Sequence, residues 1–217
     1  MRKRTASSAV GHQRDAQASR AAILKAALNE FSEMGYDGSR VDRIAQSAGV
    51  SKPLLYDYFG DKEELYRHVL REAYLQIRTA EQELDLLSFS PQDAVEVLVK
   101  FTIEHFHKNP WFIRLLNTEN LRKGSTVQTI EDRQLIQSNL LDKVAAILTK
   151  GNETGIFLRR VKPFDLYLII ASLCYFPVSN RHTLEGVFGY EFGRESLIAH
   201  AERSAQMIVA WLKTPDA

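Results

Sequence analysis

The 217-residue sequence contains one cysteine, Cys174, and no long hydrophobic run. A single cysteine excludes a framework of internal disulfides and favours a reducing compartment. The longest nearly apolar run, Leu166 to Val178, is shorter than the roughly 18 residues that a membrane span needs. Basic residues near the N-terminus have no apolar stretch behind them, which a secretory signal would require. These absences predict a cytoplasmic protein with no membrane partner.

An excess of charge of one sign is also absent, because 28 Lys and Arg oppose 27 Asp and Glu. The distribution is less even. Residues 1–20 carry five basic residues and one acidic residue, a net of +4, whereas residues 21–70 carry six and eight, a net of −2. We therefore interpret residues 1–18 as a basic flexible arm of the kind that often binds nucleic acid. A solvated tail without function is an equally good interpretation of the arm alone.

Signals of enzymatic chemistry are missing as well. His105 and His107 are two residues apart, so a helix would point them in different directions and they could not share a metal. The glycine-rich stretch 186–193 lacks the lysine and the preceding strand of a phosphate-binding loop. Cys174 has no basic neighbour that would activate its thiol. The sequence predicts no enzyme, no metal and no cofactor.

Strand patterns are nearly absent, whereas apolar residues recur with the 3.6-residue period of a helix. We predict an all-α fold of about nine helices. The first predicted helix starts at Ser19, carries one apolar stripe and ends at Gly35, which is placed to act as its C-terminal cap. Two short helices follow, and a fourth spans about 62–84. Later helices are predicted over about 92–108, 111–122, 131–150, 163–180 and 195–213.

The stretch "GSRVDRIAQSAGVSKPLLYDYFGDKEEL" predicts two short helices joined by a tight turn. Gly49 ends the first of them, and Ser51 caps the second with Pro53 in its first turn. Leu55 and Phe59 are four residues apart and face inward, so the residues between them point outward. This layout after a longer supporting helix is typical of a helix-turn-helix, whose second helix enters a major groove.

The same residues resemble the DNA-binding domain of the tetracycline-repressor (TetR) family of bacterial regulators. The close match covers about residues 20–70 without a gap. The matching positions are Gly38, Val41, Ile44-Ala45, Ala48-Gly49-Val50-Ser51, Leu55-Tyr56, Tyr58-Phe59, Lys62-Glu63 and Leu65. The resemblance implies a DNA-binding domain over residues 19–68 and a larger helical regulatory and dimerisation domain over residues 69–217.

The resemblance also implies roles for individual residues. Lys52 and Pro53 would face bases, the lysine a guanine edge and the proline a thymine methyl. The other residues would contact phosphates or cap the reading helix. They are Ser39, Arg40, Ser51, Tyr56, Tyr58 and Lys62. Two residues depart from the family pattern, because Leu54 replaces a small or hydroxyl residue and Asp42 occupies a position that is often basic.

In the larger domain, the resemblance implies a small-molecule site and dimerisation through the last two long helices. "DLYLIIASLCYFPV" is apolar around its whole circumference and must be covered on all sides. It could form a pocket wall and a subunit interface, or the central helix of a monomeric bundle. Polar side chains on the predicted helix 111–122 could orient a ligand or bond to other helices. The candidate pocket residues are Phe106, Trp111, Arg114, Asn117, Asn120, Tyr167 and Cys174.

The sequence therefore predicts a ligand-responsive transcriptional regulator, most readily a repressor. It would bind a palindromic double-stranded DNA operator as a homodimer and be released by a small-molecule effector. The alternative is a helical small-molecule-binding or enzymatic protein in which the helix-turn-helix is only structural. Salt-dependent binding to a short palindrome distinguishes the two, because a structural motif would show none.

Overall fold

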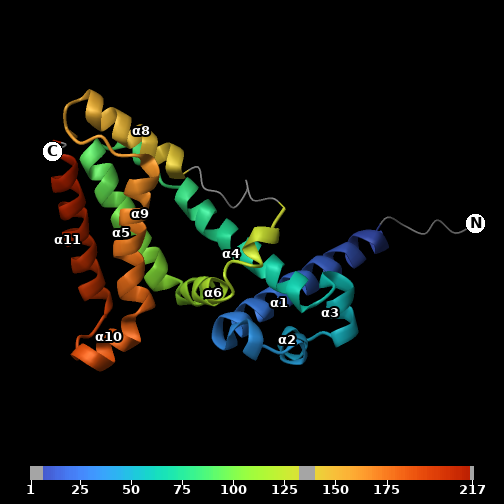
Figure 1. Ribbon diagram of the computed structural model, residues 1–217. Coiled ribbons are helices and arrows are strands. Elements are labelled where there is room, and N and C mark those ends of the chain that lie inside the picture. The colour runs from blue at the N-terminus through green and yellow to red at the C-terminus, as the bar shows by residue number, and fades with distance from the viewer. Residues whose placement is uncertain (1–6, 132–139, 216–217) are drawn as a thin grey trace, which may run out of the picture. The chain divides into compact units, whose positions relative to one another are not determined.

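The computed structural model describes residues 7–131 and 140–215, and the side chains from residue 15 onward (Figure 1). Within these residues the chain forms ten α-helices and two 3₁₀ turns, without a strand. The predicted all-α fold is confirmed. The first six helices are α1 (Ser7–Gly38), α2 (Val41–Ala48), α3 (Lys52–Phe59), α4 (Lys62–Gln82), α5 (Pro91–Lys108) and α6 (Pro110–Leu121). The others are α8 (Leu140–Glu153), α9 (Pro163–Ser179), α10 (Arg181–Phe188) and α11 (Arg194–Leu212).

The chain divides into two compact units. Unit 1 contains the residues up to Ala73 together with Arg114–Glu131, and unit 2 contains Tyr74–Ile113 and the residues from Asp132 onward. Helices α4 and α6 therefore each contribute to both units. The boundary predicted after residue 68 falls inside α4. The contribution of residues 114–131 to the first unit has no counterpart in the sequence prediction.

Unit 1 is built on the predicted pair of short helices. Gly49 adopts the left-handed conformation (φ 69°) and donates its N–H to the carbonyls of Ala45 and Gln46, which ends α2. Ser51 accepts a hydrogen bond from the N–H of Leu54 and caps α3. Such a cap typically stabilises a helix by about 1 kcal/mol. The core contains one face of each helix, namely Ile23, Ala27, Phe31, Ile44, Ala45, Leu55, Phe59, Leu65, Tyr66 and Val69.

Helix α1 is longer than predicted. It begins at Ser7 instead of Ser19, so the described part of the expected flexible arm, residues 7–18, is helical. Residues 1–6 lie outside the described residues. This segment lacks apolar periodicity, but its alanine, glutamine and arginine residues favour a helix and extend one that tertiary contacts already stabilise farther along. The other end is also extended, because α1 continues past a kink at Gly35 to Gly38.

In unit 2, α5 packs against α11, α9 and α8. Helices α5, α9 and α11 run side by side in Figure 1. The core of this bundle includes Val95, Leu98, Val99, Ile170 and Ala205. Lys143 donates to the carbonyls of Glu81, Gln82 and Leu84 at 2.8–3.1 Å. This ammonium therefore satisfies carbonyl groups that the end of α4 leaves free.

Two predicted boundaries in unit 2 do not coincide with the bounds of the described helices. Gly186 was expected in a loop but lies inside α10, because Leu184, Val187 and Phe188 continue the helix up to a left-handed Gly189. The long helix expected over 131–150 is described only from Leu140, and residues 132–139 lie outside the described residues. The predicted helices near 163–180 and 195–213 are confirmed as α9 and α11. No helix in the described ranges is long and apolar enough to span a membrane.

Gly151 in α8 is a glycine of unit 2 whose backbone leaves no room for a side chain. A Cβ atom there would lie 2.0 Å from Cδ2 of Phe157, whose ring is buried. We expect Gly151→Ala to lower the free energy of unfolding by about 1–3 kcal/mol, measured by urea titration, because the ring must move. Gly186→Ala is the matched control, since nothing lies within 4 Å of its Cβ position. It should be neutral or stabilise by up to about 1 kcal/mol, and equal effects would contradict the packing argument.

Candidate nucleic-acid interface

Helix α3 presents one apolar face to the core of unit 1 and the other face to solvent. Leu55 and Phe59 are buried, as the sequence predicts. Lys52, Pro53 and Tyr56 are exposed on the opposite side, and Tyr58 is half-buried. An eight-residue helix with a free N-terminal turn has the dimensions to lie in a major groove with its first residues against base edges. The residues predicted to read bases are therefore brought together at an accessible end.

Lys52 is held by a residue that departs from the family pattern. Its Nζ lies 2.8 Å from Oδ1 of Asp42, and 5.9 Å from the centre of the Tyr56 ring. The hydrogen bond and charge of Asp42 raise the pKa of Lys52 above its usual value, and those of Lys52 lower the pKa of Asp42. Lys52 is therefore fully charged at neutral pH. It bridges α2 and α3 across the turn while nearly half of its side chain remains exposed.

Lys62, at the start of α4, connects three parts of unit 1. Its Nζ donates to the carbonyl of Ser39 at 2.8 Å and lies 4.7 Å from the centre of the Tyr36 ring. Burial lowers the pKa of Lys62, although the nearby acidic residues counteract this effect. The side chain is partly exposed. An ammonium fixed next to the start of α2 is well placed to receive a phosphate.

Ser39, predicted to contact a phosphate, has a buried side chain whose hydroxyl bonds within the protein. Only 4% of the residue is exposed, and its hydroxyl donates to the carbonyl of Tyr36 at 2.7 Å. The hydroxyl therefore shapes the turn before α2. Arg40, which follows it, remains exposed, and its backbone N–H donates to Glu30 at 2.9 Å.

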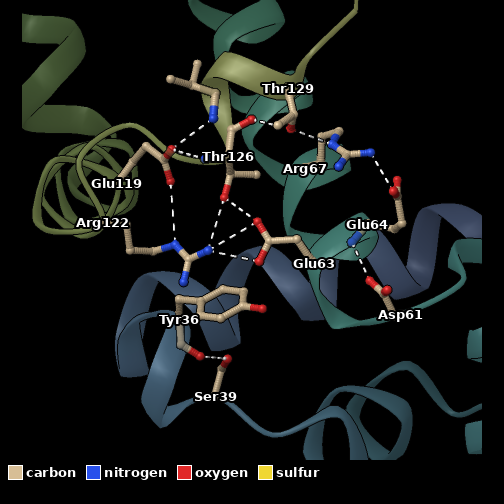
Figure 2. A network of polar contacts seen from close by, with 11 residues as sticks. Tyr36, Ser39, Asp61, Glu63, Glu64, Arg67, Glu119, Arg122, Thr126 and Thr129 are labelled. Atoms are coloured by element: carbon tan, nitrogen blue, oxygen red, sulfur yellow. Dashed lines mark hydrogen bonds and ion pairs between the residues drawn. The ribbon is translucent and has the colours of Figure 1, made fainter.

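Sequence reasoning missed a polar network around Arg122 and Glu63, the residue that follows Lys62 (Figure 2). Arg122 lies with its guanidinium carbon 3.6 Å from the centre of the Tyr36 ring, and its Nη2 donates to Glu63 at 2.9 Å. The hydroxyl of Thr126 donates to the same carboxylate, and its backbone N–H donates to Glu119. Arg20 was also missed. It donates to the carbonyl of Tyr58 at 3.3 Å and lies over the Phe59 ring.

The predicted ligand-pocket residues do not all belong to one unit. Arg114, Asn117 and Asn120 are in unit 1, whereas the other four are in unit 2. Arg114 donates to the carbonyl of Ser32 and pairs with Glu33 at 2.6 Å, so it holds α1. Arg114 was predicted to contact a ligand, and in the structure its guanidinium is bonded to residues of α1.

Of the unit 2 members of that set, Phe106 and Trp111 belong to an aromatic cluster, whereas Tyr167 packs against Phe164. Phe106 packs against Phe112 and Tyr175, with ring centres 6.3 and 6.4 Å apart. Trp111 meets Phe112 edge-on. Cys174 is buried, and burial raises the pKa of its thiol to about 12, so it is inert packing at neutral pH.

Two charged groups that the sequence analysis did not single out lie inside unit 2. Arg78 binds both carboxylate oxygens of Glu81 at 2.7–2.8 Å, and both side chains are mostly buried. Burial lowers the pKa of His105, which also senses the charges of Glu81 and Arg78. No group of three or more potential metal ligands occurs among the residues that the structure describes.

Two family profiles match the chain. "Bacterial regulatory proteins, tetR family" matches residues 23–69, and "Tetracyclin repressor-like, C-terminal domain" matches residues 91–209. Among curated proteins, the HTH-type transcriptional repressor NicS of Pseudomonas putida is 36% identical over 75% of this chain and 76% of its own length. The HTH-type transcriptional regulator RutR of Escherichia coli K12 is 39% identical over 73% of this chain and 74% of its own.

Solved structures share the fold at lower identity. FadR from Bacillus subtilis, a transcriptional regulator solved in complex with stearoyl-CoA, superposes with a TM-score of 0.65. It is 20% identical, and the match covers 88% of this chain and 98% of that one. HlyIIR, a hemolysin II transcriptional regulator, gives a TM-score of 0.60 at 21% identity over 92% of this chain and 99% of its own.

Proposed function

As a member of the tetR family of bacterial regulatory proteins, this chain is a helix-turn-helix transcriptional regulator, and we propose that it is a repressor that binds a palindromic operator as a dimer. The observation that carries the proposal is the exposed face of α3. Lys52, Pro53 and Tyr56 lie on this face and take no part in the core. Lysine can donate to guanine O6 and N7, and proline can pack on a thymine methyl. The proposed setting is the cytoplasm, with no enzymatic activity.

A second copy of the chain is the partner that the surface of unit 2 fits best. Helix α9 exposes Phe164, Leu168 and Phe176, each by more than half, and the first two are four residues apart on one face. Helices α10 and α11 add further exposed apolar side chains, namely Val187, Phe188, Ile198 and Met207. Such a surface favours a self-complementary interface, because burying it gains hydrophobic free energy.

We place the effector in unit 2, near the aromatic cluster around Phe106 and Phe112. The buried Arg78–Glu81 pair and His105 supply polar groups at the edge of an otherwise apolar environment, which is how small-molecule sites fix orientation. An effector that binds the DNA-incompetent form better must bind the operator-bound dimer more weakly, by linkage. Calorimetry with and without operator measures this coupling.

The proposal is tested by selecting duplexes from a random pool with the full-length protein. We expect a palindrome whose half-sites lie about one helical turn apart, roughly 34–36 Å, or a multiple of it. Selection without an enriched sequence would favour the alternative, a helical binding protein whose helix-turn-helix is structural. Footprinting of the selected duplex should then protect two equivalent major grooves on one side of the DNA.

Lys52 provides the specificity prediction. Lys52→Ala should cost about 1–3 kcal/mol at one position of each half-site and relax discrimination there. The measurement is the affinity of wild type and variant for operators carrying each of the four base pairs at that position. Equal losses for all four would show that Lys52 contacts phosphate and does not read a base.

A further inference from the structure

We propose that Arg122 is a positioning residue for operator binding, and that residues 114–131 are a working part of the DNA-binding head rather than of the effector domain. The inference rests on the proposed function, because it concerns how the phosphate-contacting residues near Lys62 are held. The residues concerned all belong to unit 1. Figure 2 shows them converging from the end of α1, the start of α4 and the segment that follows α6.

Arg122 lies at the centre of this network. Its Nη2 donates to both oxygens of Glu63, at 2.9 and 3.2 Å, and its Nε lies 3.9 Å from Glu119. The guanidinium stacks on Tyr36 with 3.6 Å between its carbon and the ring centre. About 80% of the side chain is buried, since its relative exposure is 20%. Planar stacking and several directed bonds are properties of arginine that lysine does not reproduce.

The segment that carries Arg122 is itself fixed. Oε1 of Glu119 accepts the backbone N–H groups of Thr126 and Val127, each at 2.8 Å. The hydroxyl of Thr126, a fully buried residue, donates to Glu63 at 2.5 Å. Burial tends to raise the pKa of Glu63, but hydrogen bonds from Thr126 and Tyr36 and the charge of Arg122 lower it below its usual value. Glu63 is therefore an anion that this segment holds in place.

Two routes lead from Arg122 to the DNA-contacting residues. Glu63 is the neighbour of Lys62 in the first turn of α4. Tyr36 contacts Lys62 through its ring and accepts the Ser39 hydroxyl through its carbonyl. Lys62 in turn donates to the Ser39 carbonyl. Arg122 thus holds the Tyr36 ring, which contacts Lys62, and the carboxylate of Glu63, which follows Lys62 in the chain.

Charge gives Arg122 a second effect. Glu63 and Glu119 place two carboxylates around Arg122, and the charge of Glu63 also acts on the neighbouring Lys62. Arg122 pairs with both, so their negative charge is compensated before DNA arrives. Without it, the charge of Glu63 is left uncompensated beside Lys62 and competes with the phosphate for the ammonium. Loss of Arg122 should therefore reduce binding to all duplexes alike.

The experiment is a double-mutant cycle on the full-length protein with the selected operator. We expect Arg122→Met to weaken binding by about 10- to 100-fold, equally for operator variants, and to reduce the steepness of the salt dependence. In the Lys62→Ala background the same change should add less than about a factor of two, because its effect passes through Lys62. Arg67→Met is the matched control. It removes an arginine of the same unit that pairs with Glu64 and Thr129 at the edge of the network. Its link to the Arg122 contacts is indirect, through the bond from Thr129 to the Thr126 carbonyl, so it should leave affinity within about twofold.

Folding is checked by circular dichroism, and Arg122→Lys replaces Arg122→Met if that variant unfolds. Lysine keeps the charge but loses the planar stacking on Tyr36 and the bonds from Nη2 to both Glu63 oxygens, so an intermediate loss is expected. Unchanged operator affinity of a folded Arg122 variant would overturn the inference. So would a double variant whose loss of affinity equals the product of the losses of Arg122→Met and Lys62→Ala alone, because the two residues would then act independently. If the wild-type protein itself bound no DNA, the proposed function would fail instead, so the two failures are distinct.

Discussion

Replacing Lys62 with alanine is expected to weaken operator binding by about 10²- to 10⁴-fold. A hydrogen bond to a charged group contributes about 1.5–3 kcal/mol, and a dimer makes the contact twice. Lys62 is already held beside Ser39 and Tyr36, so little side-chain entropy is lost when it meets a phosphate. Because phosphates carry no sequence information, the loss should be the same for every duplex. Fluorescence anisotropy at several salt concentrations measures both the affinity and its salt slope.

The salt slope separates this result from an indirect one. The slope of log K against log salt should fall by about one for each contact removed, hence by about two per dimer. Lys108→Ala is the control, since it removes the same charge from an exposed pair with Glu104 in unit 2. An unchanged slope for Lys62→Ala, or an equal loss for the control, would contradict a phosphate contact at Lys62.

The second large effect is expected from Phe176→Asp. Phe176 is 57% exposed on the apolar face of α9, so a carboxylate there should cost little in a monomer and much in an interface. We expect light scattering to change from a dimer to a mass near the 24.7 kDa of one chain. Operator affinity should fall by about 10²- to 10⁴-fold, because two linked half-site contacts become separate binding events.

Leu158→Asp is the control for the interface. Leu158 is about as exposed as Phe176 and belongs to the segment between α8 and α9, where its backbone N–H donates to Leu212 at the end of α11. It is not one of the exposed apolar residues of α9, α10 and α11 named above. It should leave the mass and the affinity unchanged. A dimer that persists in Phe176→Asp would place the interface elsewhere on the chain.

The helix-turn-helix could be predicted from the sequence because its determinants are local. Gly49 supplies the left-handed turn, Ser51 caps α3, and the four-residue spacing of Leu55 and Phe59 fixes which face is buried. Each of these signals acts over a few residues. The outward direction of Lys52 and Tyr56 follows from the same spacing, so the candidate interface could largely be placed in advance.

Contacts between distant residues could not be predicted in this way. Arg122 and Glu63 are 59 positions apart, and neither stands out from other charged residues along the chain. Arg114 looked like a ligand contact because it lies on an apolar helix, yet it binds the carbonyl of Ser32, 82 positions away. The early start of α1 was missed for a different reason. Residues 7–18 have helix propensity without an apolar stripe, and the stripe was the signal used.

The most direct test of the account is the salt dependence of binding to the selected palindrome, compared with a duplex carrying one half-site. We predict a linear fall of log K with log salt for the palindrome, with a slope of several units, since each dimer contacts phosphates through several groups per subunit. The half-site duplex should bind far more weakly and with about half that slope. Equal affinities for the two duplexes, or binding that does not change with salt, would contradict the central claim that two copies of this head bind DNA together.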